Sequence, residues 1–187
     1  MRSSTRYRKP IIWLLLSLPA LIVLYRFLTD SLSYGQVIHQ TGIWSVAFLV
    51  AVMAITPVRH LFGPTRWVQA LLRQRRALGV ASFGYAALHT AVYLERKWGA
   101  DLILKEALEA TLATGWLALL IFSALAITSN DASVRQLKRR WKPLHRLVYP
   151  AAALTFAHWW LASFDPTTAN VVGGGLLAIQ ALRFKKA

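Results

Sequence analysis

Two histidines, His89 and His158, are the residues whose type and position most clearly point to chemistry. Each lies within an apolar stretch long enough to cross a membrane, where ionisable side chains are costly and usually functional. His89 follows Arg76 by 13 residues, and His158 follows His145 by 13 residues. In parallel helices, a rise of 1.5 Å per residue would place both histidines about 20 Å beyond those two residues. The spacing therefore predicts two imidazole rings that meet at one depth inside the protein.

Two facing imidazoles suit a haem b, whose iron takes one nitrogen from each side. Small residues near the histidines would leave space for the macrocycle: Gly79, Gly84, Ala86, Ala87, Ala152, Ala153 and Ala157. Aromatic residues would pack against its edge: Phe83, Tyr85, Phe156, Trp159 and Trp160. Because protein ligands would fill both axial positions, the pair favours electron transfer over oxygen chemistry. A single membrane histidine, by contrast, can simply bond to a neighbouring helix.

A second haem at the level of His145 is left open by the sequence. His145 would be its ligand, and Arg76 would be a propionate partner or a weak ligand. Thirteen residues leave an angular offset of about 140° on an ideal helix, so His145 and His158 cannot both face one neighbour without distortion. Pro150 lies between them and can supply that distortion. His145 equally suits a histidine at the level of the lipid headgroups.

The elements that must position these residues follow from the composition. The 187 residues are 56% hydrophobic and 16% charged, and they include no cysteine. This excludes a disulfide framework, iron–sulfur clusters and thiolate zinc sites, and it makes a nucleic-acid-binding protein a poor interpretation. The sequence instead predicts an all-α, polytopic transmembrane bundle that forms one domain over 1–187, without internal repeats. Six apolar stretches are candidate membrane helices: 11–28, 37–55, 77–93, 113–127, 144–163 and 171–182.

The basic residues predict the orientation of this bundle. If the N-terminus is cytoplasmic, 18 of the 22 Lys and Arg residues lie on the inner side, whereas six of the seven acidic residues lie on the outer side. This is the positive-inside pattern, with both termini cytoplasmic, and it explains the net charge of +15 by contact with anionic membrane lipid. The second and third stretches, and likewise the fourth and fifth, would be joined by connections of about 20 residues.

Several segments resemble the MsrQ family within the ferric-reductase-like transmembrane group. They are TGIWSVAFLVAVMAITPVRH (41–60), RRALGVASFGYAALHTAVY (75–93), the pair Thr128 and Ser129, and WKPLHRLVYPAAALTFAHWW (141–160). The similarity extends over residues 11–182, and the W-x-x-L-H-R-L-V-Y string is its most specific part. Ferric reductases and NADPH oxidases resemble the chain more loosely, with two histidines on each of the two helices. Position 76 is Arg here, as in the MsrQ pattern.

The resemblance implies a haem-binding inner-membrane subunit of a bacterial methionine-sulfoxide reductase system. Electrons would enter from a quinone or a flavin reductase, with FMN as an implied cofactor. They would leave to a periplasmic molybdenum-cofactor subunit, so this chain would be an electron-transfer subunit and not the catalytic one. Acidic residues of the outer connections would offer a docking surface: Glu95, Asp101, Glu106 and Glu109.

Three other functions remain open at this stage. One is a ferric-reductase-like oxidoreductase with another electron acceptor. A small non-redox transporter is a further alternative, although no Asp or Glu lies near the centre of a predicted helix. The last is a structural assembly factor, for which the histidines would have no redox role.

Overall fold

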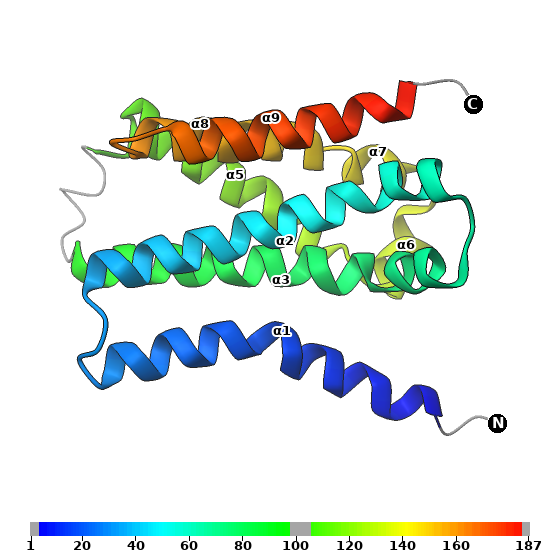
Figure 1. Ribbon diagram of the computed structural model, residues 1–187, viewed down its shortest axis with the longest axis horizontal. Coiled ribbons are helices and arrows are strands. Elements are labelled where there is room, and N and C mark those ends of the chain that lie inside the picture. Colours follow the sequence, from blue (N-terminus) through cyan, green and yellow to red (C-terminus); the bar gives the residue numbers. More distant parts are fainter. Residues whose placement is uncertain (1–3, 98–105, 185–187) are drawn as a thin grey trace.

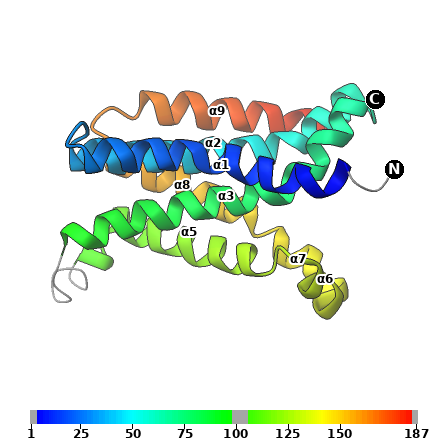
Figure 2. The same cartoon turned by 90° about the horizontal axis from the view of Figure 1, so that it is seen from below.

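The computed structural model describes residues 4–97 and 106–184, and helices make up all of the regular structure over those residues. The long helices lie side by side, and α1 begins at the end of the bundle where α9 finishes (Figure 1). Turned by 90°, the bundle has α9 and α5 on opposite sides, with α2 and α8 between them (Figure 2). The elements are α1 Ser4–Leu28, α2 Tyr34–Phe62, α3 Arg66–Arg96, α5 Ala110–Ile127, α6 Asp131–Leu137, η1 Lys138–Arg140, α7 Trp141–His145, α8 Val148–Ala162, α9 Thr167–Ala181 and η2 Leu182–Phe184.

Four of these helices are long and apolar enough to cross a membrane: Pro10–Leu28 within α1, and the whole of α2, α3 and α5. The other two predicted stretches correspond to α8 and α9, which have 15 residues each. Fifteen residues span about 22 Å, less than the bilayer core of about 30 Å. The all-helical membrane fold is therefore confirmed, whereas six complete spans are not.

The orientation of the bundle stays a prediction. Both described chain ends lie at one end of the bundle, but the structure does not show which side that end faces (Figure 1). Some of the charged residues used in the orientation argument fall outside the described residues: Arg2, Asp101, Lys105, Lys185 and Lys186.

The prediction of a long connection between the second and third apolar stretches is wrong. The helices α2 and α3 continue well past their apolar parts, and only residues 63–65 join them. Gly63 makes this short turn possible because its φ of +67° lies in a region that side chains disfavour. Hydropathy marks only the part of a helix that lies in lipid, while backbone hydrogen bonds extend the helix into the Arg-rich segment. The connection between α5 and α8 likewise contains α6, η1 and α7.

The outer surface of the bundle is apolar. Leu15 is 62% exposed on α1, Leu120 is 66% exposed on α5, and Leu177 is 73% exposed on α9. Exposed leucines on several helices would be a liability in water, but they are the expected surface toward lipid. The buried core lies between α2, α5, α8 and α9 and includes Leu49 and Phe122.

Two serines join α2 and α3. The hydroxyl of Ser45 donates to the carbonyl of Ser82, and the hydroxyl of Ser82 donates to the carbonyl of Ser45, both at 2.9 Å. Small residues let two backbones approach closely, and hydrogen bonds between helices substitute for the hydrophobic driving force that lipid does not supply. This reciprocal pair fixes α3, and with it His89, against α2.

The helix α1 is held by one tyrosine of α3. The hydroxyl of Tyr85 accepts from the N–H of Ala20 at 2.8 Å and donates to the carbonyl of Leu16 at 2.9 Å. A regular helix would pair these two backbone groups with each other. The insertion lies next to Pro19, which has no N–H to offer, and α1 bends near its middle (Figure 1).

We expect Tyr85→Phe to lower the free energy of unfolding by about 1 kcal/mol, because it removes two hydrogen bonds between α1 and α3 while Ala20 and Leu16 can pair with each other instead. The melting temperature in detergent measures the loss. Tyr25→Phe is the matched control, since Tyr25 lies on α1 and is 68% exposed. Equal melting temperatures for the two variants would contradict the role of Tyr85.

Candidate functional site

A cavity of about 760 Å³ lies between α2, α3, α5 and α8. It is at the end of the bundle where α2 and α5 begin, opposite the end where α1 begins (Figure 1). Most of its walls are apolar, and a few polar groups point into it, which is typical of a cofactor site. The volume is in the range of sites for large organic ligands.

His89 on α3 and His158 on α8 both line this cavity. Their ring centroids lie 6.2 Å apart, and the ring planes are nearly perpendicular, at 88°. The structure therefore brings together the two residues that the spacing paired. His89 lies on α3, which runs antiparallel to α2, and His158 lies on α8, which runs antiparallel to α5. The two rings therefore face different helices.

Each imidazole is anchored by a backbone carbonyl of a neighbouring helix. Nδ1 of His89 lies 2.9 Å from the carbonyl oxygen of Ile38 in α2, and Nδ1 of His158 lies 2.7 Å from that of Thr111 in α5. A carbonyl only accepts, so Nδ1 must carry the proton in both rings. Nε2 is then the nitrogen with a free lone pair, which is the form of histidine that binds a metal.

Two glycines allow this approach, and the sequence analysis missed both. A Cβ on Gly115 would lie 2.9 Å from Nδ1 of His158, and a Cβ on Gly42 would lie 3.3 Å from Nδ1 of His89. Only a residue without a side chain fits under the first ring, and the second ring leaves little more space. Both glycines follow a threonine, in the pairs Thr41-Gly42 and Thr114-Gly115, and this short repeat is the signal that could have identified them.

The arrangement fits a metal with two axial imidazole ligands. The 6.2 Å between ring centroids leaves space for one ion bonded to a nitrogen of each ring at about 2 Å. An ion with only two protein ligands needs a further group to complete its coordination. The large apolar cavity around the rings has the volume for a macrocycle that would do so. The residues present therefore fit a haem.

The walls of the cavity differ from the predicted set. Of the predicted aromatic residues, Trp159 lines it, whereas Phe156 and Trp160 face a separate groove toward α9. Tyr85 is turned toward α1, and Phe83 packs on the core. The aromatic residues that do line it, besides Trp159, are Tyr93, Trp116, Phe122 and Phe164.

The predicted small residues are also only partly at the site. Ala86 lines the cavity, while Ala157 lines the groove toward α9 and Ala152 is buried in the core. Gly79 and Gly84 do not line the cavity, and a Cβ on either would meet nothing within 4 Å. Proximity in sequence to a histidine does not determine which wall a residue faces, because neighbouring residues of a helix point in different directions.

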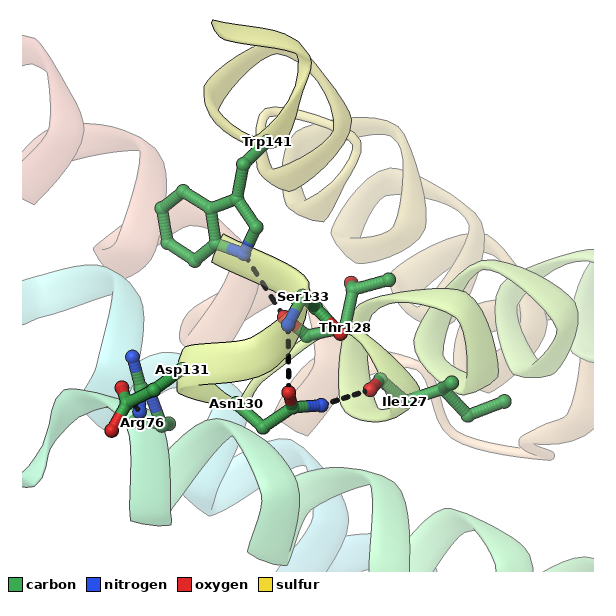
Figure 3. A network of polar contacts seen from close by, with 7 residues as sticks. All are labelled: Arg76, Ile127, Thr128, Asn130, Asp131, Ser133 and Trp141. Carbon is green, nitrogen blue, oxygen red and sulfur yellow. Dashed lines mark hydrogen bonds and ion pairs between the residues drawn. The ribbon is translucent and has the colours of Figure 1, made fainter. Parts of the chain in front are cut away.

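His145 lies outside this cavity, at the other end of the bundle. Its Nε2 lies 3.1 Å from the hydroxyl of Thr128, and its ring stacks on Trp141 with centroids 3.9 Å apart. Arg76 donates to Asp131 at 2.6 Å. Figure 3 shows this joint between α5, α6 and α7, in which Trp141 donates to the carbonyl of Thr128. His145 and Arg76 thus both have protein partners here.

A break just before Pro150 separates the helix that carries His145 from the helix that carries His158. The helix α7 ends at His145 and α8 begins at Val148. The ring of a proline clashes with the carbonyl four residues earlier, which here belongs to Arg146. That carbonyl instead accepts the N–H of Tyr149 at 3.1 Å. The predicted distortion is therefore present. His145 contacts one end of α5 and His158 contacts the other.

Tyr93, which lines the cavity, takes part in a cluster with the ion pair of Lys97 and Glu106. Lys97 and Tyr93 both donate to the carboxylate of Glu106. The hydrogen bond from Lys97 lowers the pKa of Glu106, and the same bond raises the pKa of Lys97. Of the predicted acidic docking surface, Glu106 is thus engaged within the chain, and Asp101 lies outside the described residues.

Comparison with known families places the site in context. Residues 41–156 match the model of a family described as the ferric reductase like transmembrane component. This match covers more than half of the chain and includes His89 and His145.

Several curated proteins are similar over most of the chain. A relative from Xanthomonas oryzae pv. oryzae (strain MAFF 311018) is 40% identical, over 80% of this chain and 68% of its own length. Relatives from Xanthomonas euvesicatoria pv. vesicatoria (strain 85-10) and Brucella ovis are each 37% identical, over 81% and 79% of this chain and 70% and 69% of theirs. All three are named protein-methionine-sulfoxide reductase heme-binding subunit MsrQ.

We expect Gly115→Ala to lower the free energy of unfolding by about 1–3 kcal/mol, because the new methyl group overlaps the anchored ring of His158. Thermal unfolding in detergent measures this effect. Gly84→Ala is the control: its methyl group meets nothing within 4 Å, so the change is neutral or stabilises by up to about 1 kcal/mol. A Gly115→Ala protein as stable as Gly84→Ala would show that the close approach is not required.

Proposed function

Since the chain belongs to the ferric reductase-like transmembrane family, and within it to the MsrQ proteins, we propose that it binds one haem b between His89 and His158 and carries electrons across the membrane. The observation that carries this proposal is the pair of rings 6.2 Å apart, each with Nδ1 bonded to a carbonyl. The name of the relatives, heme-binding subunit, supports the same cofactor.

A bound haem b supplies a one-electron carrier. The protein contributes the two imidazoles, whose carbonyl partners hold the ring planes and leave Nε2 of each ring as the donor. Apolar walls such as Phe122 and Trp159 would make the surroundings of the centre less polar. If His89 and His158 both held the iron, no position would be left for oxygen, and the haem would serve electron transfer.

A single haem is the form of the site that the structure favours. The imidazole of His145 contacts the hydroxyl of Thr128 and stacks on Trp141, and the guanidinium of Arg76 forms an ion pair with Asp131. In this proposal both residues stabilise the joint between α5 and α7. The predicted roles of His145 as a ligand and of Arg76 as a propionate partner or weak ligand belong to a second haem, which the one-haem proposal does not need.

The partners in this proposal follow from the family. The relatives are named as subunits of a protein-methionine-sulfoxide reductase, which implies that catalysis resides on another chain. We place this chain in the bacterial inner membrane, where it passes electrons to a periplasmic molybdenum-cofactor subunit that repairs oxidised methionine. A quinone or a flavin reductase is the donor, and FMN is implied by the family resemblance. A ferric-reductase-like protein with another acceptor is the alternative, and electron delivery to a purified reductase subunit distinguishes the two.

We expect His89→Ala and His158→Ala each to abolish haem binding, because each removes one of the two imidazoles that would hold the iron in this site. The haem-to-protein ratio and the Soret absorbance of the purified protein measure the loss. His60→Ala is the matched control, since His60 is an exposed histidine at the opposite end of α2. Full haem content in either cavity variant, or a wild-type protein that takes up no haem under adequate supply, would refute the proposal.

We expect His145→Ala to retain the haem and its reduction potential, because His145 contacts Thr128 and Trp141 and not the cavity. A potentiometric titration of wild type and variant checks this expectation. One transition at the same potential in both proteins supports a single haem. Two transitions in the wild type, one of them absent from the variant, would establish a second haem at His145.

A further inference from the structure

The two histidine anchors are copies of one arrangement, and each contains a threonine hydroxyl. In α2, the carbonyl of Ile38 receives Nδ1 of His89 at 2.9 Å and the hydroxyl of Thr41 at 3.0 Å, and that hydroxyl also lies 2.8 Å from the carbonyl of Val37. In α5, the carbonyl of Thr111 receives Nδ1 of His158 at 2.7 Å and the hydroxyl of Thr114 at 2.8 Å, and that hydroxyl lies equally close, at 2.8 Å, to the carbonyl of Ala110. The threonine lies three residues after the carbonyl in both helices.

The geometry of an α-helix explains why Thr and Gly occur together. A threonine hydroxyl reaches back to the carbonyls three and four residues earlier. The residue four positions after a carbonyl donates its N–H to it, and that residue is Gly42 in α2 and Gly115 in α5. The glycine thus provides the helical hydrogen bond and the space for the imidazole. The threonine hydroxyl shares its one hydrogen between this carbonyl and that of the preceding residue, and so adds a third, partial donor to the same oxygen.

Three donors compete for one carbonyl oxygen that has two lone pairs. Each additional donor withdraws electron density from the oxygen and weakens the bonds to the others. The hydrogen bond from Nδ1 of a ligating histidine raises the basicity of its other nitrogen. A weaker bond therefore makes a less basic ligand, and a less basic ligand favours ferrous over ferric iron.

We propose that Thr41 and Thr114 are positioning residues whose hydroxyls raise the reduction potential of the haem by weakening the carbonyl hydrogen bonds of His89 and His158. This inference rests on the proposed haem site. It adds two residues that touch neither the iron nor the macrocycle in that site but act through the carbonyls that hold its ligands. Because the arrangement occurs twice, the two effects are expected to add.

The test is a potentiometric titration of purified, haem-loaded wild type, Thr41→Val, Thr114→Val and the double variant. Valine keeps the shape of threonine and removes the hydroxyl. Each single change is expected to lower the equilibrium constant for one-electron reduction about threefold to tenfold, with full haem content. Tenfold corresponds to about 59 mV for one electron. The double variant is expected to show the sum of the two shifts.

Two controls separate tuning from packing. Thr114→Ser keeps the hydroxyl, so its potential should stay at the wild-type value. Ser123→Ala removes another hydroxyl of α5, which donates to the carbonyl of Leu119, and should also leave the potential unchanged. Unshifted or raised potentials in both valine variants, or loss of haem from them, would overturn the tuning role. A haem-free wild type would instead refute the proposed function itself.

Discussion

A histidine that binds a metal almost always gives its other ring nitrogen a hydrogen-bond partner, which orients the ring. In this protein both rings have the same kind of partner, which is a backbone carbonyl near the start of a neighbouring helix. The carbonyl fixes the tautomer, the ring plane and the free nitrogen at once. The two contacts link α3 to α2 and α8 to α5 beside the cavity that these four helices line.

The supporting structure is built to hold those carbonyls close to the rings. Ser45 and Ser82 hold α3 against α2. The break before Pro150 lets the chain change direction so that α8 packs along α5. Gly115 removes the side chain that would otherwise keep α5 away from His158. In lipid, where burial of apolar surface does not drive helices together, such small residues and hydrogen bonds determine which faces meet.

The sequence predicts the depth of His89 and His158 well, because the rise per residue of a helix is fixed. It does not predict their anchors, since Ile38 and Thr111 lie far from the histidines in sequence and act through backbone atoms. Hydropathy located four helices that are long enough to span a membrane but not their ends, as the three-residue turn at Gly63 shows. The extent to which His145 is engaged by Thr128 also required the fold, because no sequence pattern reports a side-chain partner 17 residues away.

The nearly perpendicular rings have a consequence for the electronic state of any ion between them. Each ring is tied to a different helix, so neither can turn into the plane of the other without losing its carbonyl. If the proposed haem iron were held between them, crossed imidazoles would donate π density along two directions at right angles, and the two iron d orbitals that receive it would become almost equal in energy. The folding of the backbone would thereby set the magnetic anisotropy of the centre.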